Sequence, residues 1–331
     1  MPVSIKDIAK AAGVSPSTVS RALNDHPHIR DETKLLIHNL AKQMGYVPSV
    51  LARSLVARRT ATIGVAITDL ADPYYARLML GIEAAAAGHH YQVVLSSYYR
   101  DATRELAIVR DFHMRRVDGI IVTGSEIEEA YHPAENHFFM PVVLINRPDY
   151  YHSVSVDRLL GAQKIVEHLI ELGHRRIAHI TEGAKFRAKS RRLQGYVAAL
   201  TKHQLEVDGN LIVDGDGGIS GGIQAAPGLL DLAQPPTAIF CFNDLTAIGA
   251  INALRQRGYD VPQDVSVAGY DDLEMAAYYH PALTTVRQHT FQLGQSAVNM
   301  LLKLIQGEAE VSPVMLVPKL VIRQSTAAVA V

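Results

Sequence analysis

Apolar residues at helical spacing divide the start of the chain into three short amphipathic segments. In the first segment they recur at i, i+3, i+4 and i+7, the spacing of one helix face. These residues are Ile5, Ile8, Ala9 and Ala12. Ser4 precedes them at an N-cap position, with Asp7 three residues later, and Gly13 allows a tight turn after the helix.

The second segment, "VSPSTVSRALN" at 14–24, places apolar and polar residues on opposite arcs of a helix. Ser15 is positioned to cap this helix, and Pro16 to occupy its first turn. One arc holds Thr18, Val19, Ala22 and Leu23, and the other holds Pro16, Ser17, Ser20, Arg21 and Asn24. A third amphipathic helix follows Asp31, and its apolar face consists of Ile37, Leu40, Ala41 and Met44.

After Arg59 the pattern changes to short β-rich runs separated by segments of helix length. The predicted strands are "TIGVAI", "YQVVLSS", "GIIVTG", "PVVLIN", "RIAHI", "TAIFCF" and "VSVAGY". Strands that alternate with helices predict a parallel sheet covered by helices on both faces. Roughly 270 residues are too many for one such sheet, so we expect two α/β lobes.

The net charge of −1 conceals an uneven distribution. Residues 1–60 carry nine Lys or Arg and four Asp or Glu, a net charge of +5, so the remainder carries −6. A basic head on an acidic body indicates that the head binds a polyanion, although chance is the alternative explanation. Three helices, the second with a polar face, are typical of a helix-turn-helix that places this helix in the DNA major groove. The alternative is a small helical bundle with a solvated polar face.

Other features of the sequence limit the classes of function that are possible. Cys241 is the single cysteine, so no internal disulfide can form, and we expect a buried strand residue in a reducing cytoplasm. No apolar run reaches the length of a membrane span, and charged residues interrupt any secretory signal at the N-terminus. His132, Glu135 and His137 lack metal-ligand spacing, so a surface loop is expected there. No nucleophile-base pair supports an enzyme, and neither a cofactor nor a metal is expected.

The stretch "SIKDIAKAAGVSPSTVSRALN" resembles the N-terminal signature of the LacI/GalR (lactose/galactose repressor) family of bacterial transcription regulators. The stretch "GYVPSVLARSL" is similar to that family's hinge. The resemblance implies that Pro16, Ser17 and Arg21 occupy base-reading positions, although Pro16 has no side-chain hydrogen-bonding group. It also implies that Leu55 is a wedge inserted into the minor groove by paired hinge helices. The candidate DNA-binding residues are Ser15, Pro16, Ser17, Thr18, Arg21, Asn24, Ala52 and Leu55.

Later stretches, among them "CFNDLTAIGAINALRQRGYDVPQDVSVAGYDD" and "PALTTVRQ", resemble the same family. The implied fold is α/β: a helix-turn-helix domain followed by a periplasmic-binding-protein-like domain of two Rossmann-like lobes, with ligand in the cleft between them. We expect a DNA-binding domain at 1–47, a hinge helix and linker at 48–59, and an effector-binding and dimerisation domain at 60–331. The first lobe would take about 60–158 and 288–317, and the second about 159–287 and 318–331.

Polar and aromatic side chains gather where the predicted strands end, which is where open α/β sheets bind ligands. The candidate effector-binding residues are Asp69, Asp72, Tyr74, Tyr75, Asn146, Arg192, Asn243 and Asp271. Carboxylates accept hydrogen bonds from hydroxyl groups, and aromatic faces cover the apolar side of a sugar, so this set suits a sugar or polyol. An N-cap role is the alternative for each aspartate. Around Gly217, where several family members place a stacking aromatic residue, this chain has "DGDGGISGG".

The resemblance therefore predicts a cytoplasmic transcription regulator, most simply a repressor, whose operator affinity a small sugar effector controls. Its partners would be a pseudo-palindromic double-stranded operator and a second copy of the chain, with no membrane. The chain ends at Val331 soon after "LVIRQST", so a dimer is expected rather than a larger assembly. The alternatives are a carbohydrate receptor without a regulatory role and an enzyme built on the same lobes.

Overall fold

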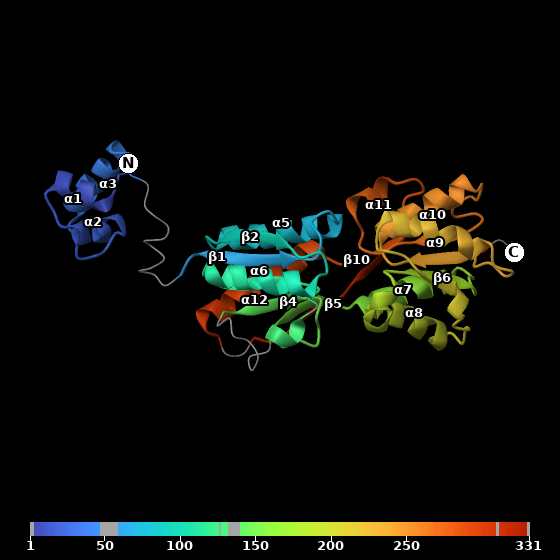
Figure 1. Ribbon diagram of the computed structural model, residues 1–331. Coiled ribbons are helices and arrows are strands. Elements are labelled where there is room, and N and C mark those ends of the chain that lie inside the picture. The colour runs from blue at the N-terminus through green and yellow to red at the C-terminus, as the bar shows by residue number, and fades with distance from the viewer. Residues whose placement is uncertain (1–2, 47–58, 126, 132–139, 309–310, 330–331) are drawn as a thin grey trace. The chain divides into compact units, whose positions relative to one another are not determined.

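The computed structural model describes residues 3–46, 59–125, 127–131, 140–308 and 311–329 (Figure 1). The chain forms two compact units, Met1–Thr60 and Ala61–Val331. No described helix is both long and apolar enough to cross a membrane. The predicted fold class, a helix-turn-helix followed by a two-lobed α/β domain with parallel sheets, is confirmed.

The first unit is a bundle of three short helices around a small core. The helices are α1 (Ile5–Ala12), α2 (Pro16–Leu23) and α3 (Asp31–Gln43). Their buried apolar side chains are those of Ile8, Ala9, Val19, Ala22, Ile37 and Ala41. The Asp7 carboxylate accepts hydrogen bonds from the backbone N and the hydroxyl of Ser4, at 2.9 and 2.6 Å. Helical spacing therefore located all three helices, and α3 begins at Asp31 itself rather than after it.

The first lobe of the second unit is built on a parallel sheet with the strand order β11-β5-β4-β3-β1-β2. Its strands are β1 (Thr62–Ile67), β2 (Gln92–Ser97), β3 (Gly119–Thr123), β4 (Val142–Ile145), β5 (Ser153–Val156) and β11 (Val314–Leu316). Its helices are α5 (Pro73–Gly88), α6 (Ala102–Met114), the 3-10 turn η1 (Glu128–Tyr131) and α12 (Thr290–Gln306).

The second lobe is built on a smaller parallel sheet with the order β7-β6-β8-β9. Its strands are β6 (Ile177–Thr181), β7 (Ile212–Asp214), β8 (Ala238–Cys241) and β9 (Ser266–Ala268). The helical segments are α7 (Arg158–Glu171), η2 (Ala184–Lys189), α8 (Arg191–Lys202), η3 (Gly209–Leu211), α9 (Ile219–Leu230), α10 (Asp244–Gln256) and α11 (Glu274–Tyr278). Strands β10 (Thr285–Arg287) and β12 (Lys319–Val321) form an antiparallel pair that packs against α7.

Alternation along the strands explains how helices cover both faces of each sheet. In β1, Ile63, Val65 and Ile67 pack in the cluster that contains the apolar residues of α5 and α12. Ala66 of the same strand packs on the opposite face, with the apolar residues of α6. Gly81 of α5 lies so close to α12 that a Cβ there would stand 2.1 Å from the Phe291 carbonyl oxygen. Glycine at this position therefore permits the close approach of the two helices.

The chain passes between the lobes three times, after Val156, after Arg287 and after Leu316. The seven predicted strands are all present, and Cys241 is buried in β8 as expected. Sequence patterning missed β5, β7, β10, β11 and β12, each of only three or four residues. The three crossings bring the loops that follow several strands of both sheets, and the crossing segments themselves, into one region.

Candidate DNA-binding and effector sites

The N-terminus of α2 is fixed by the hydroxyl group of Ser15. This oxygen accepts a hydrogen bond from the backbone N of Thr18 at 3.1 Å. It also lies 2.7 Å from the hydroxyl of Ser17 and 2.9 Å from that of Thr18. Pro16 occupies the first helical position, where its missing N–H is not needed. The predicted cap is confirmed, and it orients the short polar side chains of the first turn.

The polar arc of α2 lies at the surface, whereas Val19 and Ala22 are buried. Pro16, Ser17 and Arg21 are exposed. Arg21 forms no hydrogen bond or ion pair with any residue that the structure describes, so its guanidinium group is available to an external acceptor. The Asn24 side chain is exposed too, but its amide donates to the Ser20 carbonyl at 2.8 Å. Ala52 and Leu55 lie outside the described residues.

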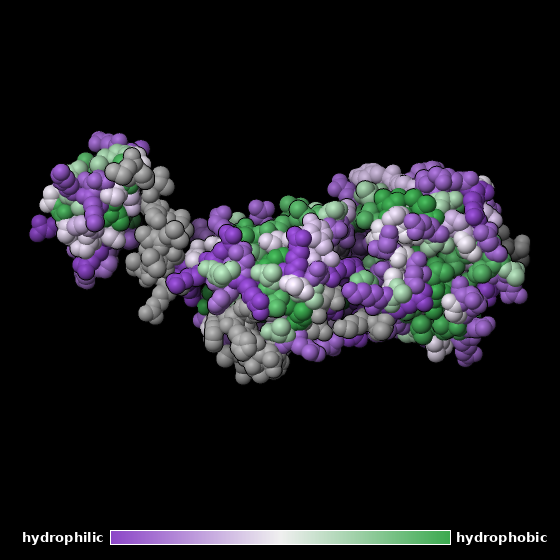
Figure 2. Space-filling view, viewed as in Figure 1, coloured by the Kyte–Doolittle hydropathy of each residue, from purple (hydrophilic) through white to green (hydrophobic). Residues whose placement is uncertain are grey.

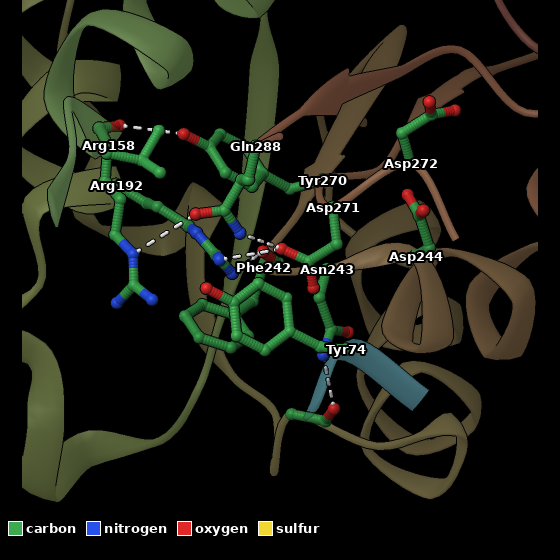
Figure 3. Close-up of polar contacts among 12 residues, drawn as sticks. Tyr74, Arg158, Arg192, Phe242, Asn243, Asp244, Tyr270, Asp271, Asp272 and Gln288 are labelled. Carbon is green, nitrogen blue, oxygen red and sulfur yellow. Dashed lines mark hydrogen bonds and ion pairs between the residues drawn. The ribbon is translucent and has the colours of Figure 1, made fainter. Parts of the chain in front are cut away.

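In the second lobe, the Arg192 guanidinium is held between two aromatic rings and a carboxylate. Its central carbon lies 4.2 Å from the ring centre of Phe242 and 4.1 Å from that of Tyr270. One Nη donates to Asp271 Oδ1 at 2.9 Å and the other to the Phe242 carbonyl oxygen (Figure 3). Arg192 is only 4% exposed, and within the described part of the chain its buried Nε has no hydrogen-bond partner.

Asp271 stands at the centre of this group. Its backbone has a φ of 114°, and its Oδ1 accepts hydrogen bonds from Arg192 and from the side-chain amide of Gln288. Burial raises the pKa of Asp271 to about 6, against the opposing effect of the Arg192 charge. The sequence-predicted pair, Arg192 and Asp271, is therefore brought together by the fold.

Two neighbouring aspartates have different surroundings and face away from Arg192 (Figure 3). Asp272 pairs with Arg287 and Arg323, each at 2.6 Å. Asp244 is fully buried and accepts from the Thr285 hydroxyl at 2.5 Å and from the Leu273 backbone N at 2.7 Å. Burial raises the pKa of Asp244 well above its ordinary value. Both carboxylates stabilise the second lobe internally, which leaves Asp271 as the aspartate of this loop that faces the site.

The first lobe contributes Tyr74 and Asp72 from the start of α5. Asp72 is the N-cap of this helix, because its Oδ1 accepts from the Tyr74 backbone N at 2.9 Å. Burial raises the pKa of Asp72, while the hydrogen bond from the Tyr74 backbone N and, after it, the positive charge of Arg192 lower it. Asp72 of the first lobe and Arg192 of the second lobe therefore interact electrostatically. The Tyr75 hydroxyl donates to Thr68 at 2.9 Å, and burial raises its pKa to about 12.

Three other predicted residues form hydrogen bonds within the protein. Asn146 donates to the Tyr74 hydroxyl at 3.0 Å and accepts from the Val156 backbone N at 3.2 Å. Asn243 caps α10 through the Thr246 backbone N at 2.9 Å, and its amide donates to the Gly217 carbonyl at 2.7 Å. Asp69 accepts from the Ala71 backbone N at 2.9 Å. These bonds already satisfy much of the hydrogen-bonding capacity of each side chain. The role of the three residues toward an effector stays a prediction.

Sequence patterning missed four residues that complete the site, namely Arg158, Phe242, Tyr270 and Gln288 (Figure 3). Arg158 and Gln288 lie at two of the crossings between lobes, and no strand-end rule points to them. Phe242 is the last residue of the predicted strand "TAIFCF" and directly follows the observed strand β8, so its place at a strand end could have been inferred from the sequence. Among the described residues, no group of three or more His, Cys, Asp or Glu could hold a metal ion.

Comparison with known families matches both units. Residues 4–49 match the family described as bacterial regulatory proteins, lacI family, and residues 166–326 match a periplasmic binding protein-like domain. The chain is 34% identical to the HTH-type transcriptional repressor CytR of Escherichia coli strain K12, over 98% of this chain and 96% of CytR. It is 36% identical to the repressor PurR of Edwardsiella ictaluri over the same shares of the two proteins.

Solved structures agree with this match. The lac repressor dimer bound to operator and the anti-inducer ONPF superposes with a TM-score of 0.90 at 31% identity, covering 99% of this chain and all of that chain. The transcriptional regulator CelR in complex with cellobiose has a TM-score of 0.73 at 31% identity and covers 98% of this chain and 99% of that chain. The similarity therefore extends over both units, including the segments that carry the two candidate sites.

Proposed function

Since the chain belongs to the lacI family of bacterial regulatory proteins, it is a transcription regulator with a helix-turn-helix DNA-binding domain, and we propose that it represses a carbohydrate operon under the control of a small sugar effector. The observation that carries this proposal is the combination of a solvent-facing α2 with a second, buried polar site in the other unit. A DNA-binding unit alone would need no such site.

The DNA-binding role rests on α2. Its exposed side chains are short near the N-terminus, which lets the helix approach phosphates closely, and Arg21 can pair with the O6 and N7 of guanine. Leu55 and Ala52 of the hinge remain proposed minor-groove contacts, on the family resemblance alone. The relatives CytR and PurR carry the word repressor in their names, which supports repression as the sign of regulation.

The effector role rests on the groups around Arg192 and Asp271. A carboxylate, a guanidinium and the rings of Tyr74 and Phe242 suit the hydroxyl groups and the apolar face of a sugar. The CelR structure contains cellobiose, and a LacI-family regulator from Enterococcus faecium contains ribose. We include no catalytic role, and we place the protein in the cytoplasm, where its DNA target lies.

A homodimer is part of the proposal. Large apolar side chains are exposed on both lobes, and Figure 2 shows hydrophobic surface over α5 and α9 on the face that is drawn. These side chains include Leu80, Val94, Ile223, Met275 and Tyr278, the last 82% exposed. A two-fold dimer would align two copies of α2 with the two halves of a pseudo-palindromic operator.

The test begins with selection of DNA ligands from a random library, followed by fluorescence polarisation with the selected duplex. We expect a pseudo-palindromic site bound by two chains, and a change in operator affinity of about 1–3 kcal/mol when the effector binds. A chain that binds sugars but shows no sequence preference for DNA would instead be a carbohydrate receptor, the second function that its fold allows.

A further inference from the structure

Arg158 lies at the first crossing between the lobes, as the first residue of α7. Its Nε donates a long hydrogen bond, 3.4 Å, to the side-chain oxygen of Gln288, and its carbonyl oxygen accepts from the Tyr270 hydroxyl at 3.3 Å. The two Nη groups have no acceptor among the residues that the structure describes. Figure 3 shows the end of this guanidinium pointing away from both of these contacts. The N–H groups of both Nη atoms therefore remain available to an external acceptor.

The hydroxyl of Tyr74 is a second available donor. It accepts a hydrogen bond from Asn146, so its own hydrogen remains to be donated, and no acceptor for it occurs in the described part of the chain. Tyr75 differs, because its hydroxyl hydrogen is used by Thr68. Burial lowers the pKa of Arg158, but Tyr74, followed by Tyr75, Tyr270 and Asp271, raises it overall. Figure 3 draws the Tyr74 ring beside the end of the Arg158 guanidinium, so one ligand can reach both donors.

The nearby carboxylates do not form an ion pair with Arg158. Asp271 directs Oδ1 to Arg192 and Gln288, and Asp72 directs Oδ1 to the start of α5. Arg192 is thus paired, whereas Arg158 appears in no ion pair among the described residues. A ligand that supplies negatively charged oxygens would give the two Nη groups of this partly buried cation the acceptors that they lack among the described residues.

We propose that the effector is an anionic sugar derivative whose acidic group, a carboxylate or a phosphate, binds to Arg158 and Tyr74. This inference rests on the proposed function and names the ligand class of the same site. A guanidinium binds two oxygens of such a group in parallel, whereas a neutral hydroxyl accepts poorly from both Nη groups at once. The sugar hydroxyls would then donate to the second oxygens of Asp72 and Asp271.

The experiment is titration calorimetry with matched ligands: D-glucose, D-glucuronate and D-glucose 6-phosphate, then D-galactose with D-galacturonate, and D-ribose with D-ribose 5-phosphate. We expect at least one acid or phosphate to bind about 10- to 100-fold more tightly than its neutral parent. The difference in affinity between the sugar carboxylates and the sugar phosphates shows which acidic group the site binds. Arg158→Gln should abolish the preference, and Arg158→Lys should restore part of it.

Arg191→Gln is the matched control, because Arg191 is the residue beside Arg192 but pairs at the surface with Asp149. It should leave the preference unchanged, and thermal unfolding without ligand shows whether each variant is folded. The inference is overturned if neutral sugars bind as tightly as their acids, or if no acid or phosphate of the set binds. Binding of a neutral sugar with a change in operator affinity would then leave the proposed function standing without this inference.

Discussion

The polar face of α2 and the polar site around Arg192 are both candidate recognition surfaces, but they differ in what their side chains already bind. Arg21 is exposed and forms no hydrogen bond within the described residues. Arg192 is buried between two rings and pairs with Asp271 at 2.9 Å. A ligand of α2 gains contacts without breaking any in the protein, whereas a ligand at Asp271 must join or replace contacts that hold the second lobe.

This difference separates affinity from stability. Substitutions on the exposed face of α2 should change DNA binding and leave the fold alone, because solvent replaces the lost contacts. Substitutions at the buried site should change both, because the partner of a removed group is left without compensation in a medium of low polarity. The following predictions test this contrast, beginning with the largest expected effect.

Asp271→Ala should lower the free energy of unfolding by on the order of 3–5 kcal/mol, because it leaves the buried Arg192 charge without its carboxylate. The side chains of both residues are only 5% exposed, so water cannot take over the role. Urea denaturation followed by circular dichroism measures the change. Asp69→Ala is the control, since Asp69 is partly exposed and forms one local bond, and should cost far less. Equal stability of wild type and Asp271→Ala would contradict the contrast.

The pH dependence of stability tests the same carboxylate without removing its volume. Burial raises the folded-state pKa of Asp271 to about 6, from 3.8. Between these values the unfolded chain ionises and the folded one does not, so rising pH favours unfolding. Relative to Asp271→Asn, the wild type should lose on the order of 2–3 kcal/mol as pH rises from about 4 to about 6. The measurement is the difference in unfolding free energy between the two proteins across this range.

For Asp272 we expect the opposite pH dependence of stability. Burial alone would raise its pKa, but hydrogen bonds from Arg323 and Arg287 lower it below the ordinary value. Its contribution to stability is therefore present above pH about 4 and is lost as pH falls through the lowered pKa. Relative to Asp272→Asn, the wild type should gain stability with rising pH, and profiles of the same sign for the two aspartates would contradict one of the two assignments.

The same contrast explains what could be predicted from the sequence. Helical spacing located α1 to α3, and strong apolar runs located β1 and β8, because burial on a fixed face leaves a periodic pattern. Strands such as β10 and β12 have three residues and depend on each other for pairing, so no local pattern marks them. Local sequence thus predicts an element when its own residues supply most of the reason for it.

The candidate site follows the same rule. Arg192 and Asp271 were predicted from their places at strand and helix ends, and the fold brings them together. Arg158 and Gln288 were not, because the path of the chain between the lobes sets their positions. The strand-end rule also cannot tell whether a side chain is already bonded, which is why Asn146 and Asn243 were predicted as ligands while both form bonds within the protein.

On the exposed side of the contrast, Arg21→Ala should weaken operator binding by on the order of 1–3 kcal/mol per half-site and relax the preference at one base pair. The thermal unfolding temperature should not change, because Arg21 has no partner among the described residues to lose. Arg110→Ala, an exposed arginine on α6 of the other unit, is the control and should leave binding unchanged. A uniform loss of affinity across all operator variants would make Arg21 a phosphate contact instead.

Ser15→Ala should give the smallest effect, and it sharpens the boundary between the two kinds of site. Ser15 is exposed, yet its hydroxyl accepts the Thr18 N–H at 3.1 Å, so it holds the structure as well as facing solvent. Loss of an N-cap costs about 1 kcal/mol, which corresponds to roughly fivefold faster amide exchange at the start of α2. Hydrogen exchange on the full chain measures this, with Ser17→Ala as the control, because the side chain of Ser17 bonds only to Ser15. If Ser15→Ala weakened DNA binding without faster exchange, the hydroxyl would act on DNA directly. If amide exchange became faster and DNA affinity fell by no more than the loss of helix stability explains, α2 would depend on a structural hydrogen bond even on its exposed face.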